Sequence, residues 1–112
     1  MGRAWLGLWG LHDHDGRFLG RAGLRFTELD GDQVLEIAYT LDRPAWGQGL
    51  ATEVASALVE QWRTRMTDPL LVGIVDVENH ASANVLLKAG FTRVRQTRFH
   101  DLDVDVFELA RP

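Results

Sequence analysis

The chain has 112 residues, of which 46% are hydrophobic and 25% charged, and this composition is typical of one soluble globular domain that spans residues 1–112. It has no Cys, which excludes disulfides, thiolate metal sites and an acyl-cysteine intermediate, and its net charge of −4 without a basic block argues against a nucleic-acid surface. No apolar stretch approaches the roughly 20 residues of a membrane span, so we expect a cytoplasmic protein without a membrane partner.

The first third of the chain has the pattern of antiparallel strands. Trp5–Leu11 is apolar and is followed by turn chemistry at residues 13–16. In Phe18–Phe26 two arginines alternate with apolar residues, as in a strand. Val34–Leu41 is apolar on both faces, which is typical of a central strand covered on both sides, and it contains one acid, Glu36.

From Leu50 the apolar period changes to that of a helix. The apolar stripe of this helix is Leu50, Val54, Leu58 and Trp62. Asp68-Pro69 ends the pattern, and Leu70–Val75 is a short apolar run of the buried-strand type. Asn79 can cap a second helix, and Gly90 stands where a glycine commonly follows a helix end.

Two closing strands are expected at Val94–Phe99 and Val104–Leu109. The predicted order is therefore three strands, a helix, a strand, a helix and two strands. The central strand–helix–strand unit predicts a right-handed crossover that makes two strands parallel within a mixed sheet. The fold class is α/β, in the form of an α+β mixed sheet.

The most specific motif is the glycine-containing segment of residues 43–53, which lies between a predicted buried strand and an amphipathic helix. Small residues at Gly47, Gly49 and Ala51 allow a ligand to approach the backbone, and the first turn of a helix binds anions such as pyrophosphate. A glycine-rich turn without a ligand is the alternative. The spacing matches neither a Walker loop nor a dinucleotide fingerprint.

This segment resembles the pyrophosphate loop of the GNAT N-acetyltransferase superfamily, Gln/Arg-x-x-Gly-x-Gly/Ala. Gly49 and Ala51 match the two small positions, and Trp46 replaces Gln or Arg in a version that looks like the RimJ/RimL branch. A second block, residues 77–91, is similar to the Asn-x-x-Ser segment of that branch, which ends in Gly-Phe. The resemblance runs from about Trp5 to the C-terminus, so it implies a GNAT-like fold without the family's first strand and helix pair.

The resemblance implies an N-acetyltransferase that moves an acetyl group from acetyl-coenzyme A to a primary amine by direct attack. The acceptor would be a protein N-terminus or a small molecule. The residues implied in cofactor binding are Tyr39, Thr40, Leu41, Trp46, Gly47, Gln48, Gly49, Leu50, Ala51, Thr52 and Asn79. The alternatives are an acyl-coenzyme A binding module that has lost turnover and a fragment that folds only as a dimer.

Two residues match catalytic positions of the family. Glu36 matches a general base, and the alternative is an ion pair with Arg21 or Arg25. Ser82 matches a proton donor to the leaving thiolate, and the alternative is a small serine that packs a helix. The Tyr that many family members carry as donor is replaced by Leu86.

Histidines provide two further hypotheses. His100, in the last predicted hairpin, is an alternative base, although a solvated loop histidine is the simpler interpretation. His12-Asp13-His14-Asp15 coincides with a hairpin turn and implies no further ligands, so we expect no metal site.

The assembly state follows from the part of the family fold that is not matched. Without it the strand at Trp5–Leu11 becomes a sheet edge, and one face of the sheet lacks its usual cover. We therefore expect a homodimer with Trp5 or Trp9 in the contact.

Overall fold

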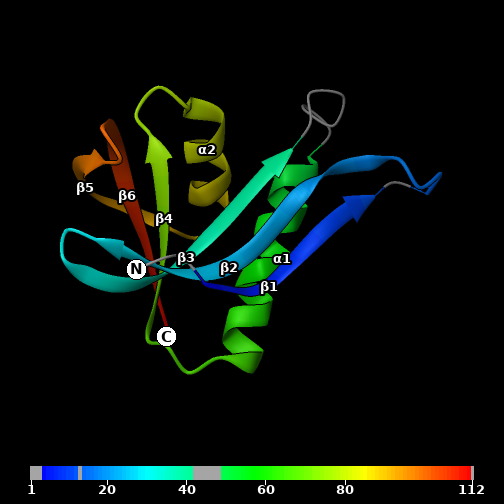
Figure 1. The fold of residues 1–112 in the computed structure, drawn as a ribbon, viewed down its shortest axis with the longest axis horizontal. Coiled ribbons are helices and arrows are strands. Elements are labelled where there is room, and N and C mark those ends of the chain that lie inside the picture. Colours follow the sequence, from blue (N-terminus) through cyan, green and yellow to red (C-terminus); the bar gives the residue numbers. More distant parts are fainter. Residues whose placement is uncertain (1–3, 13, 42–48, 112) are drawn as a thin grey trace.

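A computed structural model describes residues 4–12, 14–41 and 49–111, with residues 4–9 described by their backbone. The elements in chain order are β1 (Ala4–His12), β2 (Phe18–Leu29), β3 (Asp32–Leu41), α1 (Leu50–Arg65), β4 (Leu70–Asp76), α2 (His80–Lys88), β5 (Thr92–Phe99) and β6 (Leu102–Ala110) (Figure 1). This is the predicted order. Neither helix in this part of the chain combines the length and apolar character needed to cross a membrane.

The six strands form one mixed sheet in the order β1-β2-β3-β4-β6-β5. β3 and β4 are parallel, as the crossover rule predicts, and the other neighbouring strands are antiparallel. Both helices pack against one face of the sheet. The buried residues of that core are Ala22, Leu24, Leu35, Ile37, Val54, Ala55, Leu58, Val59, Trp62, Leu71, Val75, Leu86, Phe91 and Phe107. The mixed α/β fold expected from the sequence is therefore confirmed.

The opposite face of the sheet has a smaller core of its own, made by Leu29, Val72 and Val106. The turn between β2 and β3 reaches β5, where Asp30 accepts hydrogen bonds from Arg95 and, at 3.1 Å, from the Thr97 hydroxyl. Through this contact, the turn between β2 and β3 covers part of the sheet face that has no helices.

The C-terminal end of α1 is held by Arg111. Its guanidinium donates to the carbonyls of Trp62 (2.9 Å), Arg63 (3.2 Å), Asp68 (2.9 Å) and Met66, and it lies 4.6 Å from the Trp62 ring. The last carbonyls of a helix have no partner within the helix, and a cation is favourable there. α1 is therefore fixed at the end opposite to the candidate site.

α2 is short, and its position depends on local signals that the sequence carries. Asn79 Oδ1 accepts from the Ser82 amide at 3.1 Å, which confirms the predicted N-cap, and Gly90 follows the helix with φ +102°. A Cβ on Gly73 of β4 would lie 2.5 Å from Leu86 Cδ1. Glycine at this position therefore lets α2 pack directly against β4.

Candidate functional site

The parallel strands β3 and β4 pair only at Glu36–Val72 and Ile37–Gly73 and then diverge. Beyond these two pairs, the carboxyl-terminal residues of the strands, 38–41 in β3 and 74–76 in β4, do not pair with each other. Backbone N–H and C=O groups along such an opening can pair with a ligand that carries amide groups, in the manner of an added strand.

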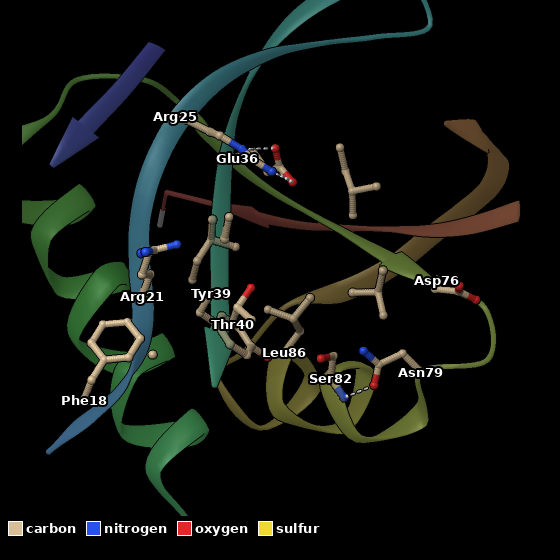
Figure 2. A pocket seen from close by; sticks show the side chains of 15 residues that line it. Phe18, Arg21, Arg25, Glu36, Tyr39, Thr40, Asp76, Asn79, Ser82 and Leu86 are labelled. Atoms are coloured by element: carbon tan, nitrogen blue, oxygen red, sulfur yellow. Dashed lines mark hydrogen bonds and ion pairs between the residues drawn. The ribbon is translucent and has the colours of Figure 1, made fainter. Parts of the chain in front are cut away.

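Two cavities meet at this opening. The larger, about 860 Å³, is lined by the end of β3, the start of α1, and α2 with the segment before it. The smaller, about 530 Å³, is lined by β2, β3, β4 and α2, and Figure 2 shows its side chains. The residues that line both are Tyr39, Thr40, Asp76, Asn79 and Ser82. These five residues, the junction, mark the place where ligands in the two cavities would touch.

The larger cavity is bordered by the N-terminus of α1, whose geometry suits an anion. Gly49 is the N-cap with φ +73°, no side chain of the described residues caps the helix, and the first helical hydrogen bond, Glu53 N–H to Gly49 carbonyl, is 3.2 Å long. The N–H groups of Leu50, Ala51 and Thr52 therefore lack helical partners, and all three residues line the cavity. The predicted positions Trp46, Gly47 and Gln48 lie outside the described residues.

The remaining predicted cofactor residues also line the larger cavity. Tyr39, Thr40 and Leu41 form its β3 wall, and Asn79 lies opposite. Because Asn79 Oδ1 is used in capping α2, its side chain offers the cavity an N–H donor. Lys88 of α2, which is not among the predicted residues, adds a cation to the side of the cavity that α2 forms.

Glu36 is 4% exposed and lines the smaller cavity. It pairs with Arg25, its cross-strand neighbour, through Nε–Oε1 at 2.9 Å and Nη2–Oε2 at 3.5 Å. The ion-pair alternative is therefore present, with Arg25 as the partner. Arg21 lies opposite Thr40 instead, and its guanidinium is 5.6 Å from the ring centre of Phe18.

Tyr39 has a hydroxyl that is buried without a hydrogen-bond partner among the described residues. Leaving a buried donor unsatisfied costs about 1–3 kcal/mol, so native structures rarely contain one. Burial raises the pKa of the Tyr39 phenol, and the nearby Ser82 hydroxyl partly offsets the rise. The two hydroxyls do not reach normal hydrogen-bond geometry, which leaves the phenol with an open donor position.

The histidines that the sequence singled out do not line either cavity. His100 occupies the β5–β6 turn with φ +49°, stacks edge-on against Phe99 at 4.3 Å, and lines neither cavity. Among the described residues no group of three His, Cys, Asp or Glu could hold a metal ion. Asp13 of the proposed metal motif lies outside those residues.

Asp76 is a site residue that the sequence analysis missed. It lies at the carboxyl end of β4 and lines both cavities, and its Oδ1 accepts from the Glu78 amide at 2.9 Å. A signal was available, because ligands bind at the carboxyl ends of parallel strands and Asp76 directly follows the apolar run Leu70–Val75.

Comparison with solved structures finds the same fold in several acetyltransferases. A putative GnaT-family acetyltransferase of Bordetella pertussis superposes with a TM-score of 0.81 at 24% identity, over 93% of this chain and 65% of that one. Ribosomal-protein-S5-alanine acetyltransferase of Vibrio fischeri gives 0.79 at 14% identity, over 92% and 60%. YncA of Salmonella typhimurium, a putative acetyltransferase solved with its cofactor acetyl-CoA, gives 0.72 at 24% identity, over 86% and 60%.

At the sequence level, the uncharacterized protein YkkB of Bacillus subtilis is 29% identical over 102 residues, which are 90% of this chain and 59% of YkkB. The chain thus spans about three-fifths of the length of the relatives it matches. The sequence model of the acetyltransferase (GNAT) domain matches residues 2–92. The chain therefore belongs to the GNAT acetyltransferase family.

Proposed function

We propose that this protein transfers an acetyl group from acetyl-coenzyme A to a primary amine, which is a protein or peptide N-terminus or a small molecule. The observation that carries the proposal is the junction where β3 and β4 diverge. It connects a cavity suited to an anion to a second cavity that is lined in part by Arg25 and Glu36, on the sheet face without helices. A donor and an acceptor can approach each other there from opposite sides.

The larger cavity fits coenzyme A in three respects. The free N–H groups at Leu50, Ala51 and Thr52, with Lys88 on the facing wall, suit a pyrophosphate. The ends of β3 and β4, which do not pair with each other, suit the two amides of the pantetheine arm, and Asn79 offers an additional donor to them. The acetyl thioester would supply an electrophilic carbonyl to the junction.

On the face without helices, Glu36 is the group that takes the proton from the amine as its nitrogen bonds to the acetyl carbon. Arg25 holds this carboxylate in place through both oxygens. On the helix face, Ser82 lines both cavities and presents a hydroxyl to the side from which the sulfur departs.

The smaller cavity would receive the acceptor amine. Arg21 and Phe18 at its rim offer a cation and an aromatic surface, and Asp76 and Glu36 offer carboxylates. A zwitterionic or peptide-like amine matches this mixture of charges. The names of solved structures with this fold support both kinds of acceptor. The Vibrio fischeri protein is named as an acetyltransferase of an alanine of ribosomal protein S5, and another structure is an aminoglycoside acetyltransferase in complex with coenzyme A and kanamycin.

A second candidate function is acyl-coenzyme A binding without turnover. The observation in its favour is that Arg25 engages both oxygens of Glu36, so this carboxylate is already occupied in an ion pair. The cofactor cavity would be retained and the base would serve only as a structural ion pair.

Acetyl-coenzyme A is expected to raise the melting temperature, because a ligand that binds only the folded state stabilises it by mass action. At a hundredfold excess over the dissociation constant the gain is about 2.7 kcal/mol, which corresponds to roughly 10 °C or more for a domain of this size. Differential scanning calorimetry measures the shift. No shift at millimolar ligand, together with no heat of binding in a titration, would exclude both candidate functions.

Release of coenzyme A from acetyl-coenzyme A distinguishes the two candidate functions, and a thiol reagent can measure it. Since the chain contains no Cys, a thiol reagent detects only the coenzyme A that is released. Peptides with free N-termini and small primary amines are offered as acceptors, with the same peptides N-terminally blocked as controls. Release that depends on a free amine supports the transferase, and binding without release supports the regulatory module.

We also propose that two copies associate through β1, which is an edge strand of the sheet. The exposed N–H and C=O groups of an edge strand are a template for pairing with another chain. Light scattering is expected to give twice the mass of one 12.6 kDa chain, with Trp5 and Trp9 fluorescence changing on dilution. A stable monomer at micromolar concentration would exclude the dimer.

A further inference from the structure

The junction of the two cavities divides chemically into two sides, and this division rests on the proposed function. Side chains alternate along β3, so Glu36 and Thr40 point to the face without helices, whereas Tyr39 points with Leu35 and Ile37 toward α1 and α2. In Figure 2 the Arg25–Glu36 pair lies at one end of the smaller cavity and Ser82, on α2, at the other. A base is thus available on one side and hydroxyl donors on the other.

Among these donors Tyr39 is distinguished by its unsatisfied hydroxyl. The phenol oxygen is buried and has no hydrogen-bond partner among the described residues, whereas the residue itself lines both cavities. A buried donor without a partner at a ligand cavity is the arrangement expected when the ligand supplies the acceptor. The packing of the ring against the helix-side core keeps the hydroxyl at this position.

We infer that the Tyr39 phenol donates a hydrogen bond to the sulfur of the bound acyl thioester and stabilises the negative charge that this sulfur gains. As the amine nitrogen bonds to the acetyl carbon, the C–S bond breaks and its electron pair goes to sulfur. The amine loses its proton to the base on the opposite side, and solvent returns a proton to sulfur after departure. Leu86 of α2 has no hydroxyl, and the inferred role goes to Tyr39 ahead of Ser82, the hydroxyl donor on that helix.

The acidities of the groups favour a hydrogen bond over complete proton transfer. A thiol has a pKa of about 8.5 and a phenol one of about 10, so the proton remains mainly on the phenol. Burial raises the pKa of Tyr39 further, which keeps the phenol protonated, and able to donate, throughout the neutral range. A phenol is also a stronger acid than the Ser82 hydroxyl and therefore a stronger donor to an anion.

The chain contains one Tyr, which gives a direct spectroscopic test. Protein labelled at the Tyr Cζ carbon is expected to show one ¹³C signal from Tyr39, whose titration reports the pKa of the phenol. Coenzyme A, whose thiolate accepts the hydrogen bond, should shift this signal and raise the titration midpoint. Desulfo-coenzyme A, which fills the same cavity without the sulfur, should leave the midpoint near that of the free protein.

Tyr39→Phe provides the kinetic test. Its turnover of acetyl-coenzyme A, with the amine acceptor that reacts fastest with the wild type, should fall roughly 10- to 100-fold, while KM for acetyl-coenzyme A changes by less than about threefold. The variant should melt no lower than the wild type, because Phe keeps the ring packing and removes an unsatisfied hydroxyl. Ser82→Ala is the comparison and should lose less activity.

Two outcomes would overturn the inference without affecting the proposed function. One is that Tyr39→Phe turns over at the wild-type rate. The other is that coenzyme A and desulfo-coenzyme A change the Tyr39 titration equally although calorimetry shows that both bind. Failure of acetyl-coenzyme A to bind at all would instead exclude the proposed function itself.

Discussion

Gly49→Asp is expected to weaken acetyl-coenzyme A binding at least about 100-fold and to abolish the thermal shift. The new carboxylate would stand at the N-cap of α1, beside the N–H groups that we assign to the pyrophosphate. Two unit charges about 4 Å apart near a protein surface repel by about 4 kcal/mol, and screening by salt lowers this value. Isothermal titration calorimetry measures the dissociation constant.

Gly49→Asn is the matched variant, because Asn has nearly the shape of Asp but no charge. Both residues tolerate the left-handed conformation that φ +73° requires, and a Cβ at this position would meet no atom of the described residues within 4 Å. Gly31→Asp, in a turn with φ +88° and equally open space, tests the same substitution away from both cavities. Equal weakening by Asp and Asn at Gly49 would contradict an anion site.

The sequence predicts those parts of the site that depend on local signals. The change to a helical period directly after Gly49 locates the anion site, because the first turn of a helix carries free N–H groups whatever the rest of the fold does. Asn79 is predicted as the N-cap of α2 for the same reason, and its Oδ1 accepts from the amide of Ser82, three residues later. Ser82 itself is assigned only through the resemblance to the family. The predicted crossover is likewise confirmed by the parallel pairing of β3 and β4.

The ion-pair partner of Glu36 required the register of the β2–β3 hairpin. Arg21 and Arg25 lie on the same face of the strand, so alternation cannot choose between them. The turn resolves the choice: Asp30 and Gly31 have φ of 51° and 88° and form a two-residue hairpin turn that pairs Leu29 with Asp32. Counting back from this pair places Arg25 opposite Glu36, so the signal was present in the sequence.

The junction itself was not predictable from local patterns. The divergence of β3 and β4 after two residue pairs depends on how α1 and α2 pack against the sheet, and no sequence period reports it. Tyr39 is predicted only as one of the cofactor-binding residues, because its unsatisfied hydroxyl becomes apparent when the ring is packed in the core. Asp76 differs in this respect, because its position directly after the apolar run Leu70–Val75 marks the carboxyl end of a parallel strand in the sequence.

Glu36→Gln is expected to reduce acetyl transfer by roughly 10² to 10⁴-fold, the usual contribution of a general base, while the dissociation constant for acetyl-coenzyme A stays within about threefold. The coenzyme A release assay and calorimetry measure the two quantities. The single variant also breaks the ion pair with Arg25, whose side chain is only 16% exposed. Loss of one partner of a fully buried pair costs about 3–5 kcal/mol, so reduced stability must be separated from reduced chemistry.

The double variant Arg25→Gln/Glu36→Gln makes this separation, because it removes both charges and leaves no buried ion uncompensated. We expect it to melt closer to the wild type than Glu36→Gln does and to remain equally inactive, since the missing carboxylate is what limits transfer. Arg25→Gln alone keeps the carboxylate and should retain more activity than either. A double variant that transfers acetyl at the wild-type rate would move the base elsewhere, and Asp76, a carboxylate that lines both cavities, would be the next residue to replace.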